Sequence, residues 1–561
     1  MTEAAADHGR HNTARLLQSS AIVGLGTALS RLTGLVRVQA ISYALGATTL
    51  AGVYTWANET PNIVYELLLG GVLTATLVPQ FVRHVHDDDE DATSAVFTVS
   101  MLGLLAITII GIVAAPLIVR LYLLQVDGPT RDRQAELGTA FMRVFMPQML
   151  FYGLTALGTA MLQARRRFAA AALAPILNNL VVVAIFFALP RLVGGPFTVH
   201  NVLDDDRLLL FIGLGTTLGI VAMGLALLPA LRAAKVRLRF LPAFRHAAVK
   251  RMMRLSGWTI GYVAANQVAL AYVFILANGL ELSTGKGHGG AFVYTNAYLL
   301  FVLPYGLLAF PIMTAVAPEL AAAGRRGDPP ALRHRFARTL RLSLTVLIPA
   351  AAVAIALARP IVTALLQRGA FTPADASLVS DTLIGFAVGL PFFSVYLFAL
   401  RAFYSLDNTK TPFLLGCIQN AVNVALAIAL FDWLGIPGLA YAHSGAYAVG
   451  AMLTIFVLNR RIGSLRGRGI GLLGARVLVV AVAAGSGAWA MSRWVDWNSS
   501  GTALLATLLG LLTAGAITFG GLLALRVEEF SEVLDLVLGR FRRKRGRGDG
   551  STPTGPALEQ A

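Results

Sequence analysis

The chain has 561 residues, of which 56% are hydrophobic and only 13% are charged. A soluble globular domain carries about 25% charged residues, so this composition excludes an ordinary soluble protein. The net charge of +17 could indicate a nucleic-acid-binding protein. In so apolar a chain, Lys and Arg in the cytoplasmic loops of a membrane protein explain it better, and we expect no nucleic-acid partner.

Apolar runs of roughly 20 residues recur along the whole chain, which predicts an all-α integral membrane protein. The alternating ten-residue pattern of an outer-membrane barrel is absent. We expect about 14 transmembrane helices near residues 17–45, 50–82, 94–123, 137–162, 170–190, 209–231, 255–280, 291–320, 342–366, 376–404, 412–432, 436–458, 470–493 and 502–525.

The distribution of Lys and Arg predicts the orientation in the membrane. With the N-terminus inside, the inner segments carry 32 of the 46 basic residues and the outer segments carry 9. Cytoplasmic loops are enriched in Lys and Arg, so both termini are expected in the cytoplasm of a bacterial cell with a multi-pass chain in its inner (plasma) membrane.

An internal repeat suggests how the spans are organised. A Val-Tyr-Thr motif begins at Val53 and again at Val293, and three further pairs follow at an offset of 244: Pro147 with Pro391, Arg166 with Lys410, and Asn179 with Asn423. Spans 1–6 and 7–12 would then form two parallel six-helix lobes around a central cavity.

The repeat and the basic segments together divide the chain into parts. We expect a cytoplasmic N-tail (1–16), an N-lobe (17–231), a basic cytoplasmic linker (232–254), a C-lobe (255–458), helices 13 and 14 (470–525) and a basic cytoplasmic tail (526–561).

Two arginines lie within the first predicted span, in the stretch SRLTGLVRVQ. An Arg at mid-membrane costs about 2.5–3.5 kcal/mol on insertion scales and usually marks a functional site. Arg31 and Arg37 differ by about 120° around the helix, so they can line one broad face. Guanidinium groups can bind an anionic phosphate through paired hydrogen bonds. Alternatively, one or both reach the cytoplasmic surface or pair with a neighbouring helix.

The second predicted span carries a polar stripe. Asn58, Asn62 and Glu66 recur at intervals of four residues, and Glu59 adds a second acid on nearly the same face. Such groups do not suit lipid and should face a hydrated cavity or the arginines of span 1. A glutamate there could bind Na⁺ or H⁺ and couple transport to a gradient. A static Glu–Arg network that fixes the packing of spans 1 and 2 is the alternative.

Weaker candidates lie in the second half of the chain: Asn266, Gln267, Gln419 and Asn423. We expect these amides mainly to form interhelical hydrogen bonds. No catalytic set, nucleotide-binding lysine loop or metal-ligand spacing of histidines appears, so the chain is not expected to be an enzyme or to hold a cofactor. Transport would be driven by a coupling cation, by the membrane potential or by downstream consumption of the substrate.

Four stretches occur in a characteristic order: SRLTGLVR, ANETPNIVYELLLGGVLTATLVPQF, QRGAFTPAD and FYSLDNTKTP. Together they resemble the MurJ/MviN family of lipid II flippases, within the multidrug, oligosaccharidyl-lipid and polysaccharide exporters. The LLLGG form is similar to actinobacterial members. The resemblance implies flipping of the lipid-linked peptidoglycan precursor to the outer leaflet by alternating access, with a cationic central cavity and a groove for the lipid tail in the last two spans. Substrate-binding positions carry over at Arg31, Arg37 and Asn62.

This chain departs from the family pattern at several positions. Val38 stands where many members have Asp, and span 2 has Glu59 and Glu66 where many have basic residues. Span 8 lacks mid-membrane charge, so the N-lobe should bind the headgroup and the C-lobe should be a more apolar moving wall. Other functions stay open: export of another lipid-linked glycan, cation-coupled drug export, or a non-transporting scaffold that recruits cell-wall synthesis proteins.

Overall fold

The computed structural model describes residues 25–530 apart from 27, 67–76, 88, 127–129, 195–196, 280–288, 466 and 498. The expected N-tail (1–16), the LLLGG stretch and most of the expected C-terminal tail lie outside the described residues.

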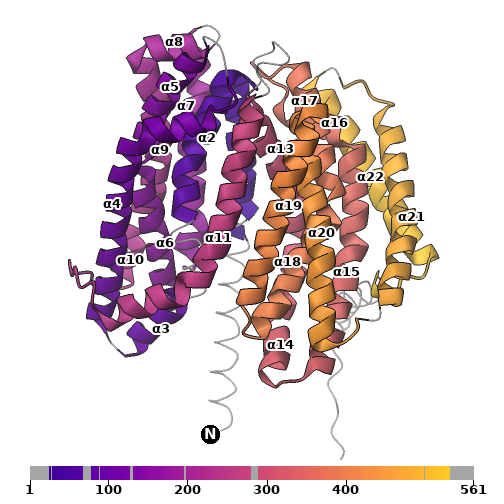
Figure 1. Cartoon of the computed structure of the whole chain (residues 1–561). Coiled ribbons are helices and arrows are strands. Elements are labelled where there is room, and N and C mark those ends of the chain that lie inside the picture. The colour runs from indigo at the N-terminus through magenta and orange to yellow at the C-terminus, as the bar shows by residue number, and fades with distance from the viewer. Residues whose placement is uncertain are drawn as a thin grey trace, which may run out of the picture.

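The described elements are helices joined by short connections (Figure 1). The first half contains a first helix at residues 28–45, then α2 (Thr49–Tyr65), α3 (Val78–His86), α4 (Glu90–Tyr122), α5 (Thr130–Phe145), α6 (Gln148–Ala164), α7 (Ala169–Leu192), α8 (Val199–Asp204), α9 (Asp206–Leu225) and α10 (Leu228–Ala233). The second half contains α11 (Ala247–Gly279), α13 (Gly290–Pro304), η3 (Tyr305–Ala309), α14 (Phe310–Arg325), α15 (Pro329–Ala356), α16 (Ala358–Leu366), α17 (Pro373–Val388), α18 (Leu390–Ser405), α19 (Lys410–Leu434), α20 (Ile436–Ile462), α21 (Gly467–Ser492) and α22 (Ser500–Ala524).

The membrane-spanning character is clear in the described part of the chain. Eleven helices there are long and apolar enough to cross a bilayer, or twelve if the bent pair α17–α18 is one span. The predicted spans 1 and 2 include residues 17–24 and 67–76, which lie outside the described residues. The total of about 14 therefore stays a prediction.

Several spans expected as continuous helices are broken at proline. The break between α5 and α6 falls at Pro147, and α17 and α18 meet at 48° just before Pro391. The span expected at 291–320 changes to a π-helix directly after Pro304. A proline has no N–H to donate and its ring collides with the preceding turn, which accounts for breaks at these places.

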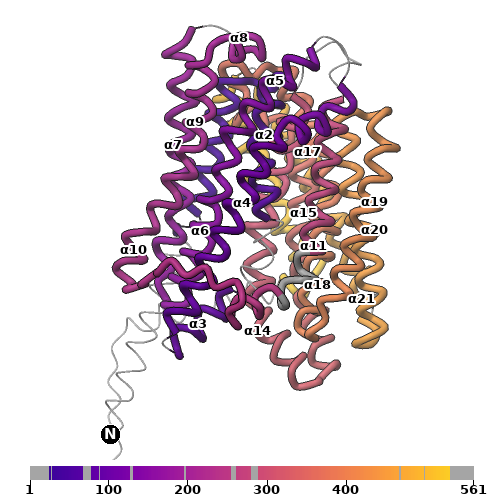
Figure 2. Tube along the Cα trace, turned by 60° about the vertical axis from the view of Figure 1, so that its left-hand side comes forward, coloured from indigo at the N-terminus to yellow at the C-terminus, as the bar shows by residue number. Residues whose placement is uncertain are grey.

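The helices gather into two groups with a third, smaller addition. In Figures 1 and 2, α2–α10 lie on one side and α13–α20 on the other, while α11 packs against both α4 and α19. The last two helices pack against each other and onto α15 and α16. In the first group, Trp56 is 1% exposed and stacks on Tyr122 with ring centroids 5.2 Å apart. Gly138 makes room for that indole, because a Cβ there would lie 2.2 Å from it.

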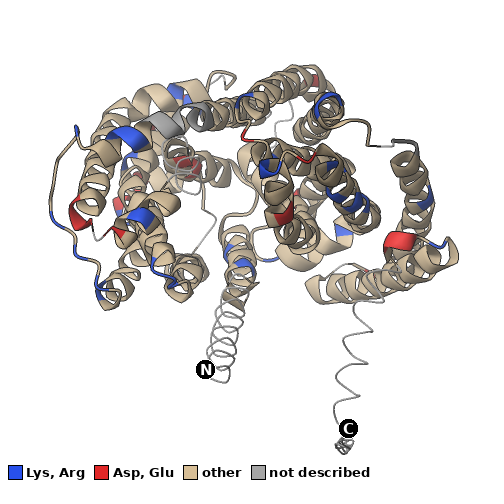
Figure 3. Cartoon of the chain, turned by 90° about the horizontal axis from the view of Figure 1, so that it is seen from below, with Lys and Arg blue, Asp and Glu red and all other residues tan. Residues whose placement is uncertain are grey.

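The segment expected as a linker, 232–254, includes helical residues at both of its ends. Helix α10 extends to Ala233 and α11 already begins at Ala247, so both ends of that range are helical. The extended segment between them is held along α4, where the Arg239 N–H donates to Ser94 Oγ (3.2 Å) and the Leu241 N–H donates to Thr98 Oγ1 (3.1 Å). Seen from below, Lys and Arg lie along the connecting segments at the edge and also on helices nearer the centre (Figure 3).

Candidate functional site

Two adjoining cavities lie between the two helix groups and share five lining residues: Arg37, Val38, Glu59, Thr295 and Asn296. We call the joined space the central cavity. Its smaller part, about 80 Å³, is bounded mainly by the first helix, α2 and α13, with further residues from α6, α7 and α9. Its larger part, about 550 Å³, is bounded mainly by α11, α13, α19 and α20. Two residues of the predicted polar stripe of span 2, Asn58 and Glu59, thus lie at the interface between the lobes.

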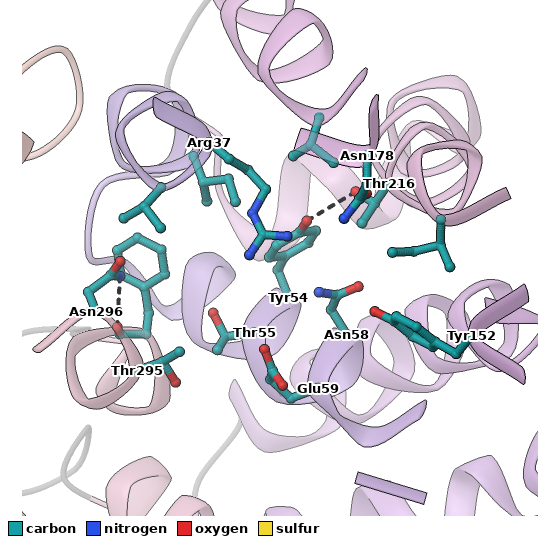
Figure 4. A pocket seen from close by; sticks show the side chains of 15 residues that line it. Arg37, Tyr54, Thr55, Asn58, Glu59, Tyr152, Asn178, Thr216, Thr295 and Asn296 are labelled. Atoms are coloured by element: carbon teal, nitrogen blue, oxygen red, sulfur yellow. Dashed lines mark hydrogen bonds between the residues drawn. The ribbon is translucent and has the colours of Figure 1, made fainter. Parts of the chain in front are cut away.

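Arg37 extends from the first helix into the central cavity. Figure 4 shows its guanidinium in the space bordered by Tyr54, Thr55 and Asn58, with Glu59 farther along the same cavity. The Nε atom is buried and has no hydrogen-bond partner. Among the described residues, no acidic group lies within 4.0 Å of the Arg37 side chain, so a tight Arg37–Glu59 ion pair is absent. A half-buried guanidinium whose Nε has no hydrogen-bond partner is available to an anionic ligand.

The polar side chains of α2 are held by neighbouring amides and hydroxyls. Asn62 Nδ2 donates to Glu59 Oε2 at 3.4 Å. Gln148 Nε2 donates to Asn58 Oδ1 (3.3 Å) and to Thr217 Oγ1 (3.1 Å), which ties α2 to α6 and α9. These bonds orient Asn58 and Glu59 toward the cavity that both line.

The structure separates the six predicted site residues into two sets. Arg37, Asn58 and Glu59 line the central cavity, whereas Arg31, Asn62 and Glu66 are not among its lining residues. Arg31 is exposed, and its guanidinium lies over η3, since a Cβ on Gly306 would be 3.3 Å from it. The functional roles assigned from the sequence stay predictions for all six.

The C-lobe wall of the cavity is uncharged but polar. The amides regarded as weaker candidates all line it, namely Asn266, Gln267, Gln419 and Asn423, together with Asn420. The expected interhelical bonding also occurs, because Asn420 Nδ2 donates to Asn266 Oδ1 at 2.7 Å. As expected, the lining residues that this lobe contributes include no Lys, Arg, Asp or Glu, although many of them are hydrogen-bonding groups.

Sequence reasoning missed several lining residues: Tyr54, Tyr152, Asn178, Thr216, Asn420 and His443. Two of these could have been found by their positions. Asn178 directly precedes Asn179, and His443 is an isolated histidine within an apolar span. Tyrosine and threonine give no such signal because both are common in membrane helices. Among the described residues, no group of three or more His, Cys, Asp or Glu could hold a metal ion.

Backbone contacts join the two lobes at the end where the predicted outer loops lie. The Gly289 N–H donates to the Ala47 carbonyl (2.9 Å), and the Ala370 N–H donates to the Tyr43 carbonyl (2.9 Å). Gly52 and Gly289 approach so closely that a Cβ on Gly52 would lie 2.9 Å from the Gly289 Cα. We call these contacts the upper seam.

A polytopic helical fold with two helix groups around a polar cavity, into which the half-buried Arg37 extends, defines a membrane transporter. The fold is similar to that of a solved "Lipid II flippase MurJ, inward closed conformation" (20% identity, TM-score 0.72, covering 90% of this chain and 99% of that chain). It is also similar to an inward-facing multidrug resistance MATE family transporter (16% identity, TM-score 0.62, covering 78% and 96%).

The sequence comparisons specify the family. The model for "Lipid II flippase MurJ" matches residues 41–508. A probable lipid II flippase MurJ of Rhizobium meliloti is 29% identical over 527 residues, covering 90% of this chain and 94% of the relative. One of Vibrio cholerae is 26% identical over 526 residues, covering 91% and 96%. The chain belongs to the lipid II flippase MurJ family, which confirms the family predicted from the four sequence stretches.

Proposed function

We propose that this protein moves lipid II from the cytoplasmic to the outer leaflet by alternating access, with the headgroup diphosphate bound at Arg37. One observation carries this proposal: the Arg37 Nε is buried at the central cavity without a partner. A diphosphate cannot cross hydrocarbon unaided, because burying its charge costs far more than thermal energy. A guanidinium in a hydrated cavity replaces the water contacts that the phosphates lose.

The lipid tail can stay in the bilayer throughout. We propose that α21 and α22 form its groove, outside the two six-helix lobes. Exposed leucines run along α22, including Leu508 and Leu512, and give that helix an apolar outer face. Opening and closing of the upper seam would then let the two lobes rock about the headgroup.

The topology proposed from the basic residues places both termini in the cytoplasm and the upper seam at the outer face. The segment between α10 and α11 would then be a cytoplasmic linker, close to anionic lipid headgroups. The basic C-terminal tail could contact the same lipids or cell-wall synthesis proteins.

Glu59 is our candidate for cation coupling by Na⁺ or H⁺. Glu59→Gln keeps a side chain that can accept from Asn62 but cannot ionise. We expect the flipping rate of this variant in vesicles to be independent of an imposed Na⁺ or H⁺ gradient. The rate should also fall about tenfold, which corresponds to roughly 1.4 kcal/mol of free energy. Glu66→Gln is the matched variant, since Glu66 does not line the cavity. If Glu66→Gln loses the gradient response and Glu59→Gln keeps it, coupling does not occur at Glu59.

Depletion of the protein in cells tests the proposed substrate directly. Lipid II should accumulate on the cytoplasmic leaflet, and its exposure on the outer leaflet should fall. Unchanged outer exposure would exclude lipid II flipping by this chain. Purified protein in vesicles separates the alternatives: a scaffold moves no lipid, and a drug exporter moves an organic cation but not lipid II.

A further inference from the structure

We propose that the C-lobe wall of the central cavity binds the sugars of the headgroup, while Arg37 binds the diphosphate. We define the sugar wall by Asn266, Gln267, Gln419, Asn423 and His443. This inference rests on the proposed function and adds a second half-site with a different chemistry.

The hydrogen-bonding groups of the sugar wall match those of a carbohydrate. An amide side chain has both donors and an acceptor, as sugar hydroxyls and N-acetyl groups do. Asn423 is 6% exposed and His443 is 7% exposed, and both line the larger part of the cavity. Asn423 Oδ1 and His443 Nδ1 are buried and lack a hydrogen-bond partner. Buried polar atoms are rarely left unpaired, so water or a ligand must complete these bonds.

Aromatic rings complete this part of the cavity. Tyr298 and His443 have ring centroids 5.7 Å apart, and His443 and Tyr447 have centroids 4.6 Å apart. All three residues line the larger part of the cavity. A sugar ring has apolar C–H faces as well as hydroxyl edges, so a site of aromatic faces and amides fits both of its surfaces.

The charges of the cavity exclude the other two parts of the headgroup from this wall. Arg37 lines the larger part from the first helix, but the lining residues contributed by α11–α20 include no Lys or Arg. A diphosphate or a peptide carboxylate placed against those residues would therefore have no counter-charge beside it. Neutral sugars carry no such cost. The volume of about 550 Å³ lies within the usual range of small-ligand sites, roughly 300–1,000 Å³.

The order of groups in the substrate agrees with the order along the cavity. The first sugar is bonded directly to the diphosphate, so it must lie next to the phosphate site. Thr295 and Asn296 line both parts of the cavity together with Arg37. A diphosphate at Arg37 therefore places the first sugar beside Thr295 and Asn296, and the next sugar toward Asn423 and His443.

Binding measurements on the full chain in lipid nanodiscs test this inference. The probes are lipid II, lipid II without its peptide, and polyprenyl diphosphate, which has the same phosphates and tail but no sugars. The variants are Asn423→Leu and His443→Phe, which keep side-chain volume and remove the unpartnered polar atom. Ile418→Ala is the control, because Ile418 lies on the same helix as Asn423 but is 45% exposed.

We expect both variants to weaken binding of lipid II and of its peptide-free form about tenfold, with the affinity for polyprenyl diphosphate unchanged. Equal losses for all three probes, or no loss, would overturn the sugar wall. A loss only for the peptide-bearing probe would overturn it in favour of a peptide site. Failure of the proposed function looks different: the unmodified protein would bind none of the probes and flip no lipid II.

Discussion

Arg37→Ala should abolish flipping of lipid II while the protein still folds. A hydrogen bond to a charged group contributes about 1.5–3 kcal/mol, so a guanidinium with two bonds to a diphosphate contributes roughly 3–6 kcal/mol. That range of free energy corresponds to a decrease of about 10²–10⁴-fold in the flipping rate. Because Arg37 forms no ion pair in this structure, its removal leaves no buried acid unpaired, and the thermal unfolding temperature should change little.

The measurement is the rate of lipid II flipping in vesicles that contain the purified variant. Arg37→Lys should keep partial activity, since an ammonium retains the charge but not the paired geometry. Arg120→Ala is the control, because Arg120 is exposed in the last turn of α4. Normal flipping by Arg37→Ala would place the diphosphate elsewhere, with the exposed Arg31 over η3 as the next candidate.

Gly289→Val should also stop transport, but for a different reason than Arg37→Ala: the added side chain should prevent closure of the upper seam. A Cβ on Gly289 would lie 2.2 Å from the Thr48 carbonyl oxygen and 2.6 Å from the Gly52 nitrogen. Both obstacles are backbone atoms and cannot rotate away, so the two lobes must separate. We expect the flipping rate to fall by at least about tenfold, since overpacking of this kind typically costs roughly 1–3 kcal/mol.

Accessibility of the cavity from the outer side distinguishes this effect from misfolding. The chain has a single cysteine, Cys417, so Cys417→Ala supplies a cysteine-free background. In that background, Thr295→Cys should react faster with a membrane-impermeant thiol reagent when Gly289→Val is also present. Gly103→Val is the matched control, because a Cβ there meets no atom within 4 Å. Unchanged labelling and normal transport in Gly289→Val would show that the seam need not close.

The fold class could be predicted from the sequence because lipid imposes a simple rule. Every spanning segment must be an apolar helix, so run length and charge locate most of the helices. The breaks within the spans were harder to predict, because the presence of a proline does not by itself determine whether a helix is interrupted. Pro61 lies inside the continuous helix α2, whereas Pro147 separates α5 from α6. The difference depends on whether neighbouring helices stabilise the freed backbone groups.

The charged part of the site was also within reach of sequence reasoning, whereas the amides of the neutral part could be named only as weaker candidates for a different role. Arg37 and Glu59 are costly in a membrane and therefore conspicuous. Helical periodicity could not show that Arg37 lines the cavity and Arg31 does not. The periodicity gives the angle between the two side chains around the helix, but not which neighbouring helix each side chain faces. Amides such as Asn423 cost far less in a membrane helix, so their meeting with His443 around one cavity emerges only from the packing of α19 against α20.

The chemistry of the upper seam has a consequence for how its closure would respond to the surrounding solution. Its two hydrogen bonds join backbone amides to backbone carbonyls, and neither group titrates or carries a net charge. A seal of ionised side chains would weaken with salt, since ions screen exposed charges beyond about 8 Å at 0.15 M. An outer solution varies in salinity and acidity beyond the control of the cell. With the orientation proposed above, the two peptide hydrogen bonds of the upper seam would keep the same strength through those changes in salinity and acidity.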